Sequence, residues 1–586
     1  MKWLDDKIDK RSERLFIFLS LAAYVVVQSF AVHAPLFPAD DLQELSFVNG
    51  MSSWTELLGR DFFGLFRPVK NVIFHVLSCF DMGNISTFRL ICIGIGIFSF
   101  FPVWGVCRRV LGANWSAALA AAIWLVSPTL VSSTAWLSCV NIQLMAGLFA
   151  WALCLHDDGR VCGAAICLVG ACLSYESAVA IGPVLVAFDY FLRPERWRTA
   201  RARWSYVVYA VVTGAYLMAR WYAGSAASLN GSLAGVSRVE LIGAAAYFSL
   251  QHVGIWFWPF GNMAVFGGYS AGQVPVLGHI VCWFVVIVLV ASAFVLRRRA
   301  PVSAFGVALA VLAFLPTSNI LGFGNGPYGD YYMDVASIGL SIALVSAVRG
   351  LTGVSGRFAR PACVLAAALL LARACGVVES ARWAYLWADG ERAFMATITT
   401  FPKAYYGFVV CAQRLCDRND FAGALAHCDE AERLIGADEE RMRTVHMVRA
   451  ICALRGEQNA EKALAWLAKC ERGCSRASII RACHFYRGCV AEDLQNDLSV
   501  ARREYEAALP LKIGSEDIRT ADRLARILAV TGDTSRAIAL WKNALRVSPG
   551  DMSVMWNLSV ALHEVGDHEE AARLQARAKG AMNAAR

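Results

Sequence analysis

The sequence predicts an all-α protein with a polytopic membrane domain of about eleven helices over residues 1–380 and a helical-repeat domain over residues 381–586. The first observation behind this prediction is that 57% of the 586 residues are hydrophobic, which is too many for a soluble chain of this length. The second is an uneven charge distribution. Residues 1–380 contain 26 Lys and Arg against 19 Asp and Glu, whereas the rest of the chain contains 29 against 27. The net charge of +9 therefore lies mostly in the apolar part, where it indicates membrane topology rather than nucleic-acid binding.

The apolar part divides into segments of roughly the length that crosses a bilayer, about 20 residues. Eleven segments are predicted to cross: 14–34, 86–106, 114–131, 134–155, 161–175, 177–192, 205–223, 276–296, 302–320, 332–349 and 361–378. The first is too long for the core of a signal peptide and is interpreted as a retained span.

Basic residues set the predicted orientation. With eleven crossings, all the basic clusters fall on one side, and the positive-inside rule makes that side the cytoplasm. These clusters are residues 7–14, 108–109, 193–203, 297–299 and 349–360. The apolar stretch 240–259 is interpreted as a helix at the outer interface, because a crossing there would move the three arginines at 297–299 outside. The loops 35–85, 224–275 and 321–331 and the C-terminal domain are then all outside.

An alanine recurs through the C-terminal domain at a spacing of 34 to 39 residues. The positions are Ala424, Ala463, Ala501, Ala537 and Ala571. The last two units are the clearest: one runs L-A-x2-L-x3-G-x4-A-x3-W-x2-A-x4-P from Leu524, and the next runs L-S-x2-L-x3-G-x4-A from Leu558. This pattern is typical of the tetratricopeptide repeat, a helix-turn-helix unit of 34 residues. Stacked units form a concave surface that suits an extended peptide, although the array can also be a packing scaffold without a ligand.

The adjacent carboxylates Asp40 and Asp41 follow the first span, and F-R-P-V-K follows at residues 66–70. One reaction that uses acidic and basic side chains together is the transfer of a sugar from a phosphate to a hydroxyl. It requires a base for the acceptor proton and a clamp for the departing phosphate. Asp40 or Asp41 is a candidate for the base, and Arg67 and Lys70 are candidates for phosphate binding. The alternative is that the two acids cap a short helix over 42–49.

Four stretches in this order resemble one family. They are Asp40-Asp41 with F-R-P-V-K, the segment A-A-I-W-L-V-S-P-T-L-V-S-S-T-A-W-L-S at 121–138, Y-E-S-A at 175–178, and F-L-P-T-S-N-I-L at 314–321 leading into D-Y-Y-M-D-V-A-S-I-G-L at 330–340. With the C-terminal repeats, they make the chain similar to the transmembrane and tetratricopeptide-repeat O-mannosyltransferases and, more broadly, to polytopic glycosyltransferases of the GT-C superfamily.

The resemblance implies roles for further residues. Glu176, Tyr331 and Tyr332 would line the outer cavity. The alternatives are a water-exposed carboxylate at a helix end for Glu176 and an interfacial aromatic belt for the tyrosines. The family usually has Lys-Glu at 175–176 and Glu-Arg at 329–330, where this chain has Tyr-Glu and Gly-Asp. Arg220, at the outer end of a span, is a candidate to replace one missing basic group beside the donor phosphate.

The leading functional hypothesis is transfer of a sugar, mannose in the family, from a polyprenyl- or dolichyl-phosphate donor to Ser or Thr of a protein held by the repeats. A glycan or lipid-linked envelope polymer as the acceptor and a non-catalytic membrane scaffold remain as alternatives. No cofactor is certain; an acid pair can bind Mg²⁺ or Mn²⁺, but the sequence contains no evident ligand set. The expected partners are the lipid-linked donor, membrane lipids and the acceptor, without nucleic acid.

The expected location is a bacterial inner membrane with a periplasmic C-terminal domain, or an endoplasmic reticulum membrane with a lumenal one. Eleven of the 19 cysteines lie in the membrane domain and eight in the C-terminal domain. In an oxidising compartment some of the latter can form disulfides, but the sequence assigns no pairs.

Overall fold

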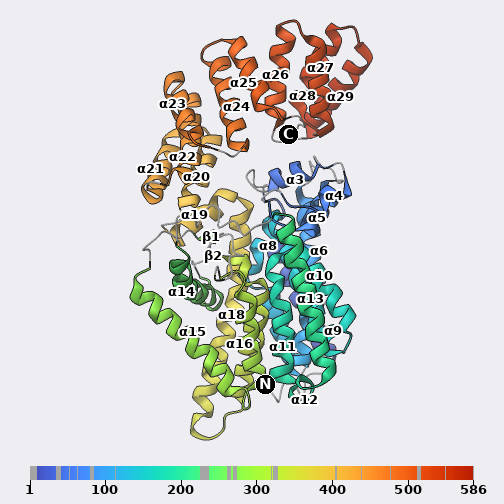
Figure 1. The fold of residues 1–586 in the computed structure, drawn as a ribbon, viewed down its shortest axis with the longest axis vertical. Helices are drawn as coiled ribbons and strands as arrows, with labels where there is room; N and C mark the ends of the chain where they lie inside the picture. The colour runs from blue at the N-terminus through green and yellow to red at the C-terminus, as the bar shows by residue number, and fades with distance from the viewer. Residues whose placement is uncertain are drawn as a thin grey trace. The chain divides into compact units, whose positions relative to one another are not determined.

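The computed structural model describes residues 10–34, 41–49, 51, 53–61, 64–78, 85–112, 114–224, 237–260, 266–267, 274–318, 320, 328–400, 402, 405–436, 438–474, 477–510, 517–547 and 550–584. The described chain is all-α except for one pair of two-residue strands, so the prediction of an all-α protein is confirmed (Figure 1). It divides into two compact units. The first comprises Met1–Phe37, Trp54–Ile73 and Ile85–Ala404, and the second comprises Pro38–Ser53, Phe74–Asn84 and Tyr405–Arg586.

The elements before residue 405 include long helices, short 3₁₀ segments (η) and two strands. In chain order they are α2 (Lys10–Ser29), α3 (Asp41–Asn49), α4 (Trp54–Leu57), α5 (Pro68–Ser78), α6 (Ile85–Leu111), α7 (Asn114–Leu125), η1 (Pro128–Leu130), α8 (Val131–Ala135), η2 (Leu137–Cys139), α9 (Val140–Asp157), α10 (Val161–Ser174), η3 (Glu176–Ala180), α11 (Ile181–Leu192), α12 (Pro194–Trp197), α13 (Ala200–Tyr222), α14 (Arg238–Phe257), β1 (Phe266–Gly267), α15 (Val276–Leu296), α16 (Pro301–Phe314), β2 (Tyr328–Gly329), η4 (Asp330–Tyr332), α17 (Met333–Thr352), η5 (Gly356–Phe358), α18 (Ala359–Ala388) and α19 (Gly390–Thr400). The strands are antiparallel, with Phe266 opposite Gly329 and Gly267 opposite Tyr328.

Six helical segments of the described chain are long and apolar enough to cross a membrane, or seven if one bent pair is a single span. They are Arg11–Ser29, Ser86–Leu111, Leu137–Asp157, Val276–Leu296, Asp330–Thr352 and Ala359–Ala388, with the bent pair Trp115–Leu125 and Pro128–Ala135. The predicted count of eleven is therefore wrong, although the possible multi-pass character of the chain is supported.

The overcount has physical causes. At about 1.5 Å per residue, α10 and α16 with 14 residues and α11 with 12 span roughly 18–21 Å, against a hydrocarbon core of about 30 Å. The α13 helix has 23 residues, but its tyrosines, tryptophans and Arg220 reduce its hydropathy. At Pro128 the chain bends by 50° between α7 and α8, because proline lacks the N–H that an unbroken helix needs. The mean hydropathy of a sequence window does not report where a helix ends or bends.

The α14 helix, predicted over 240–259 at the outer interface, is not among the six candidate spans. Its tryptophans do not share one environment. Trp258 is exposed, whereas Trp256 is fully buried and its ring lies 4.3 Å from the guanidinium of Arg373. Trp256 therefore packs against α18.

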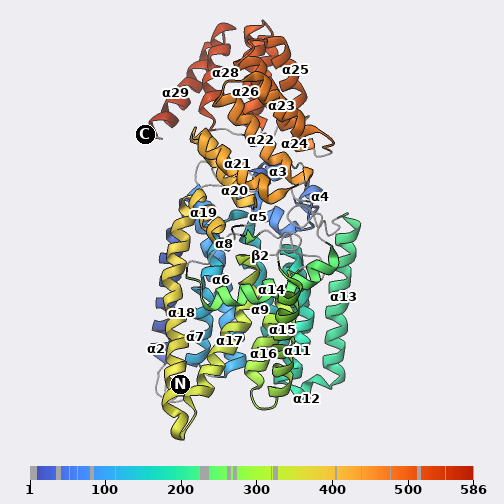
Figure 2. The ribbon, with the colours of Figure 1, turned by 90° about the vertical axis from the view of Figure 1, so that its left-hand side faces the viewer.

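One end of the first unit carries several of the basic clusters. Arg109 donates to Asp158 over 3.0 Å, Arg193 donates to Asp157 over 3.2 Å, and Arg349 donates to the carbonyl of Leu111 over 2.8 Å. These contacts join the ends of α6, α9, α11 and α17, and the start of α2, α12 and the turn before α18 lie at the same end (Figure 2). From there α10 runs about 21 Å toward the opposite end.

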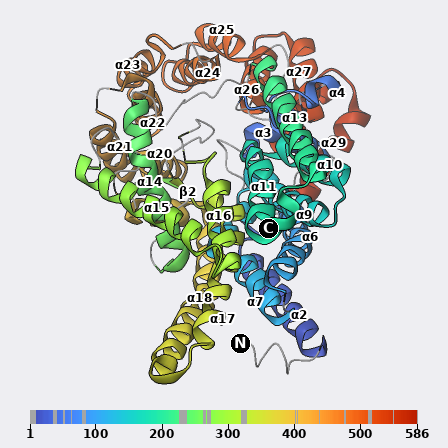
Figure 3. The same ribbon diagram turned by 60° about the horizontal axis from the view of Figure 1, so that its bottom comes forward.

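The second unit contains five consecutive helix pairs. Their helices are α20 (Tyr405–Asp417), α21 (Phe421–Ile435), α22 (Glu439–Arg455), α23 (Ala460–Glu471), α24 (Ala477–Asp493), α25 (Leu498–Ala508), α26 (Ile518–Val530), α27 (Thr534–Val547), α28 (Met552–Glu564) and α29 (His568–Ala584). Each even-numbered helix packs on the odd-numbered helix that follows it, and successive pairs stack along a curved path (Figure 3). The prediction of tetratricopeptide-like helix pairs is confirmed.

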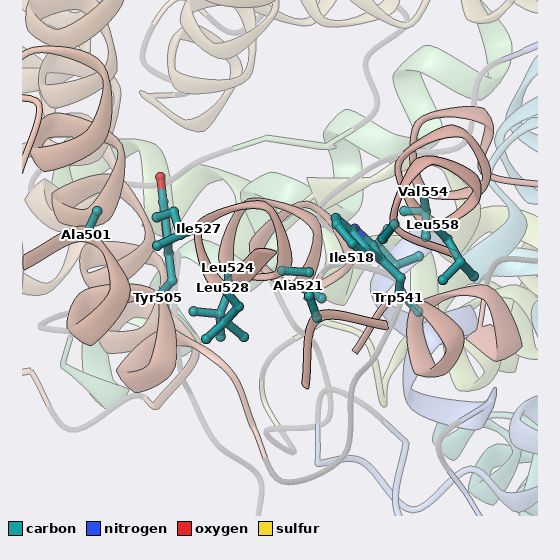
Figure 4. Close-up of a cluster of buried hydrophobic side chains, with 14 of the residues drawn as sticks. Ala501, Tyr505, Ile518, Ala521, Leu524, Ile527, Leu528, Trp541, Val554 and Leu558 are labelled. Carbon is teal, nitrogen blue, oxygen red and sulfur yellow. The ribbon is translucent and has the colours of Figure 1, made fainter. Parts of the chain in front are cut away.

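The five marked alanines occupy one structural position. Each is the fourth residue of the second helix of its pair, and each is buried where the paired helices meet: Ala424, Ala463, Ala501, Ala537 and Ala571. A small side chain is needed there because the helices approach closely. Larger residues fill the layers between pairs, as Tyr505, Leu524, Trp541 and Leu558 do in Figure 4.

The turn within each pair also repeats. The residue two places before each second helix has a positive φ: Asn419 (61°), Gln458 (49°), Asn496 (52°), Gly532 (90°) and Gly566 (89°). The next residue is Asp or Asn in every pair, and four of these five caps accept a hydrogen bond from a backbone N–H of the second helix. The first three units thus have the same turn as the last two, with Asn or Gln in place of glycine.

We predict that Gln458→Gly stabilises the second unit by about 1 kcal/mol, because a left-handed conformation is unfavourable for glutamine and costs glycine nothing. The reciprocal variant Gly532→Gln should destabilise the unit by a similar amount. Its Cβ would meet nothing within 4 Å, so the backbone conformation alone sets the cost. Thermal unfolding of the full-length protein measures both. A lower melting temperature for Gln458→Gly would contradict this account of the turn.

Candidate functional site

The candidate site in the first unit begins with a tight turn before α5. The backbone N–H of Leu65 donates to Asp61 Oδ1 over 2.8 Å, and Gly64 has the positive φ of 77° that this turn requires. Pro68 then occupies the first position of α5, where a missing N–H costs no hydrogen bond. This geometry places Arg67 and Lys70 beside Asp61, at 3.7 and 3.5 Å.

Glu176 pairs with Arg67 across 109 residues of sequence. The α10 helix ends at Ser174, Tyr175 is extended, and Glu176 begins η3. Arg67 Nε donates to Oε2 over 2.7 Å and Arg67 Nη2 donates to Oε1 over 2.6 Å, which is a bidentate arrangement. The Arg67 guanidinium also lies 4.5 Å from the centre of the Tyr175 ring.

Arg220 completes the cluster from the last turn of α13, with Nη1 at 3.9 Å from Glu176 Oε2. The five side chains Asp61, Arg67, Lys70, Glu176 and Arg220 are all buried, and we call them the charge cluster. Three cations and two carboxylates give the cluster a formal charge of +1.

The electrostatics of Glu176 follow from these neighbours. Burial raises the pKa of its carboxyl, but the charge and hydrogen bonds of Arg67, and then the charge of Arg220, outweigh burial and hold that pKa below its ordinary value of 4.5. Glu176 is therefore ionised at neutral pH and fixes the orientation of the Arg67 guanidinium. The alternative of a water-exposed helix-end carboxylate does not fit its burial.

The structure thus brings together four of the residues predicted from the sequence: Arg67, Lys70, Arg220 and Glu176. It adds Asp61, which the sequence analysis did not single out. The sequence feature that could have identified Asp61 is its position six residues before Arg67. Gly64 follows it three residues later, which is the spacing of a short turn.

The predicted catalytic carboxylates are placed differently. Asp40 lies outside the described residues. Asp41 is buried in the first turn of α3, as expected for an acid that begins the short helix predicted over 42–49. Asp41 belongs to the second unit and the charge cluster to the first. Its participation in a common site therefore stays a prediction.

Tyr331 and Tyr332, the other predicted cavity residues, lie in η4. Their rings are 4.7 Å apart, and Tyr331 also packs edge-on against Trp136 at 5.9 Å. Tyr332 is buried and its ring lies 6.1 Å from that of His252, whereas Tyr331 is partly exposed. Both tyrosines are held in an aromatic cluster of the first unit.

Two buried carboxylates next to these tyrosines were not singled out from the sequence. Ser132 and Trp383 Nε1 donate to Asp330 Oδ2, and Ser133 donates to Asp334 Oδ2 over 2.6 Å. Asp330 lies 198 residues from Ser132, and Asp334 lies 201 residues from Ser133, so these contacts cannot be recognised from local sequence.

Among the described residues, no three His, Cys, Asp or Glu side chains come together in a group that could hold a metal ion. The acid pair proposed for Mg²⁺ or Mn²⁺ includes Asp40, which the structure does not describe.

Comparison with known protein families gives no match for this chain, and comparison with curated proteins gives none either. Solved structures do show similarity. A TPR protein described as having an unusual peptide-binding site, YrrB, is 19% identical, with 33% of this chain and 93% of that chain covered and a TM-score of 0.24. The Cut9–Hcn1 hetero-tetramer of the APC/C is 15% identical, with 80% of this chain and 81% of that chain covered and a TM-score of 0.31.

Proposed function

We propose that the protein is a polytopic glycosyltransferase that moves a sugar from a polyprenyl- or dolichyl-phosphate donor to a hydroxyl of an acceptor outside the cytoplasm. The observation that carries the proposal is the convergence of Arg67, Lys70 and Arg220 in one buried cluster. Guanidinium and ammonium groups are the side chains that bind phosphate most strongly. The ordered resemblance of the sequence to lipid-phosphate sugar transferases supports the same assignment.

The location of the cluster within the first unit also supports this function. Glu176 follows α10, which begins near the arginine-rich end of the unit and runs about 21 Å away from it. If the arginine-rich end faces the cytoplasm, the cluster lies toward the outer face. In that orientation the cluster lies on the side where a lipid-linked donor with its tail in the bilayer would present its phosphate.

In the proposed mechanism, Asp40 or Asp41 accepts the proton of the acceptor hydroxyl as its oxygen attacks the anomeric carbon. The bond between that carbon and the phosphate oxygen breaks, and Arg67, Lys70 and Arg220 hold the negative charge of the departing lipid phosphate. A single displacement inverts the anomeric configuration. Glu176 acts as a positioning residue, because it orients Arg67 rather than touching the reacting atoms.

The helix pairs of the second unit are proposed to hold the acceptor, a protein presenting Ser or Thr, and a cell-envelope glycan is the alternative acceptor. A different function is a non-catalytic membrane scaffold. It is favoured by the complete bidentate pairing of Arg67 with Glu176, which is also what a purely structural ion pair would show.

Transfer of radiolabelled sugar in membranes tests the proposal. The donors are a panel of polyprenyl-phosphate sugars, and the variant is Asp40→Asn with Asp41→Asn. The matched control is Asp5→Asn with Asp6→Asn, another adjacent acidic pair near the N-terminus. We expect label in protein or glycan with wild type and the control, and at least about a hundredfold less with the Asp40/Asp41 variant. Equal transfer by both double variants, or folded wild type without transfer from any donor, would favour the scaffold.

A further inference from the structure

Two cysteines of the second unit are in direct contact although 36 residues separate them. Cys416 lies near the end of α20 and Cys452 near the end of α22, the first helices of two successive pairs. Their Sγ atoms are 3.1 Å apart. Both side chains are buried, with 2% and 0% exposure.

The contact is close to what a disulfide requires. A covalent S–S bond is about 2.05 Å long, so the two sulfurs need to approach by roughly 1 Å. Cys428 belongs to the same buried cluster and provides a matched third thiol.

We propose that Cys416 and Cys452 form a structural disulfide that ties the first helix pair to the second when the unit folds in an oxidising compartment. The proposal rests on the extracytoplasmic location that the proposed function assigns to this unit. The closure of a loop of this length restricts the unfolded chain and so stabilises the fold.

The oxidant is a disulfide, either of an oxidoreductase or of glutathione. The Cys452 thiolate attacks it, forms a mixed disulfide and displaces one thiolate. The Cys416 thiolate then attacks Cys452 Sγ and displaces the second. The two cysteines lose two protons and two electrons, and the oxidant is reduced to two thiols. Because both sulfurs are buried in the folded unit, the exchange takes place before the two pairs close on each other.

Mass spectrometry of the full-length protein tests this proposal. Free thiols are alkylated as the cells are opened, and the protein is digested with trypsin without reduction. We expect peptides 415–418 and 450–455, which contain Cys416 and Cys452, to be recovered as one linked species. Reduction should lower the melting temperature of the wild-type protein by roughly 10 °C. Recovery of both peptides alkylated and separate would overturn the proposal.

Variants supply the controls. Cys452→Ala should remove the linked species and the effect of reduction on melting, while Cys428→Ala should retain both. A link in which Cys428 replaces Cys416 would also refute the assignment. Sugar transfer is measured on the same membranes. An active transferase with reduced Cys416 and Cys452 refutes the disulfide alone, and an inactive protein with the linked peptides refutes the transferase alone.

Discussion

Replacing Gly339 with valine should strongly disrupt the helix packing of the first unit. Gly339 in α17 faces Gly306 in α16, and the two helices touch through their backbones at this point. A Cβ added to Gly306 would lie 2.7 Å from the Gly339 carbonyl oxygen, and one added to Gly339 would overlap the carbonyl oxygen of Gly306. Neither obstacle is a side chain that can rotate away. The helices must therefore separate, at a cost of about 3 kcal/mol or more.

Gly350 provides the control in the same helix, because a Cβ there meets nothing within 4 Å. Gly350→Ala should leave stability unchanged or raise it by up to about 1 kcal/mol through the helix preference of alanine. Thermal unfolding of the full-length protein in detergent measures both variants. Equal melting temperatures for Gly339→Val and Gly350→Ala would show that α16 and α17 do not pack through these glycines.

Replacing Glu176 with alanine should destabilise the first unit by about 3–5 kcal/mol. The change leaves the Arg67 guanidinium buried without its bidentate partner, and an uncompensated buried charge is costly. Asp61, at 3.7 Å from Arg67, compensates in part. Arg433 and Glu430 in α21 form the control, since they are bonded over 2.8 Å in the same bidentate manner but lie at the surface, with Arg433 exposed and Glu430 half-buried. Glu430→Ala should give no resolvable change in melting temperature.

The Arg67–Glu176 ion pair also predicts the direction in which the stability of the fold changes with pH. Because the pKa of Glu176 in the folded protein is below its ordinary value of 4.5, the pair stabilises the fold at neutral pH and is lost as the pH falls below 4.5. The wild-type protein should therefore lose stability faster than Glu176→Gln between about pH 5 and pH 3, measured as the melting temperature at each pH. Parallel curves for the two proteins would contradict the ionised pair.

Much of the second unit follows from the sequence because its determinants are local. A buried alanine such as Ala537 and a turn glycine such as Gly532 recur at a spacing that only paired helices explain. The first three units were less evident because Asn419, Gln458 and Asn496 adopt the left-handed conformation in place of glycine. Asparagine tolerates that conformation, so it leaves no clear mark in the sequence.

The membrane part was less predictable, because the hydropathy of a segment reports its amino-acid composition but not whether the segment forms one continuous helix. The break at Pro128 and the short α10, α11 and α16 helices divide the apolar sequence into fewer membrane-length helices than its windows suggest. The contacts between charged residues distant in the sequence could not be predicted either. Arg67, Glu176 and Arg220 could each be singled out as candidates, but their contact across distant parts of the sequence, and the presence of Asp61 among them, required the folded chain.

The most direct test of the account is whether the charge cluster binds a lipid phosphate. Native mass spectrometry of the full-length protein in detergent would compare a polyprenyl phosphate with the corresponding polyprenol, for wild type, Lys70→Gln and the exposed control Lys462→Gln. We predict that wild type and Lys462→Gln retain the phosphate but not the alcohol, and that Lys70→Gln, verified as folded by its melting temperature, binds the phosphate about tenfold more weakly. Equal retention of phosphate and alcohol, or unchanged binding by Lys70→Gln, would contradict a phosphate site in this cluster.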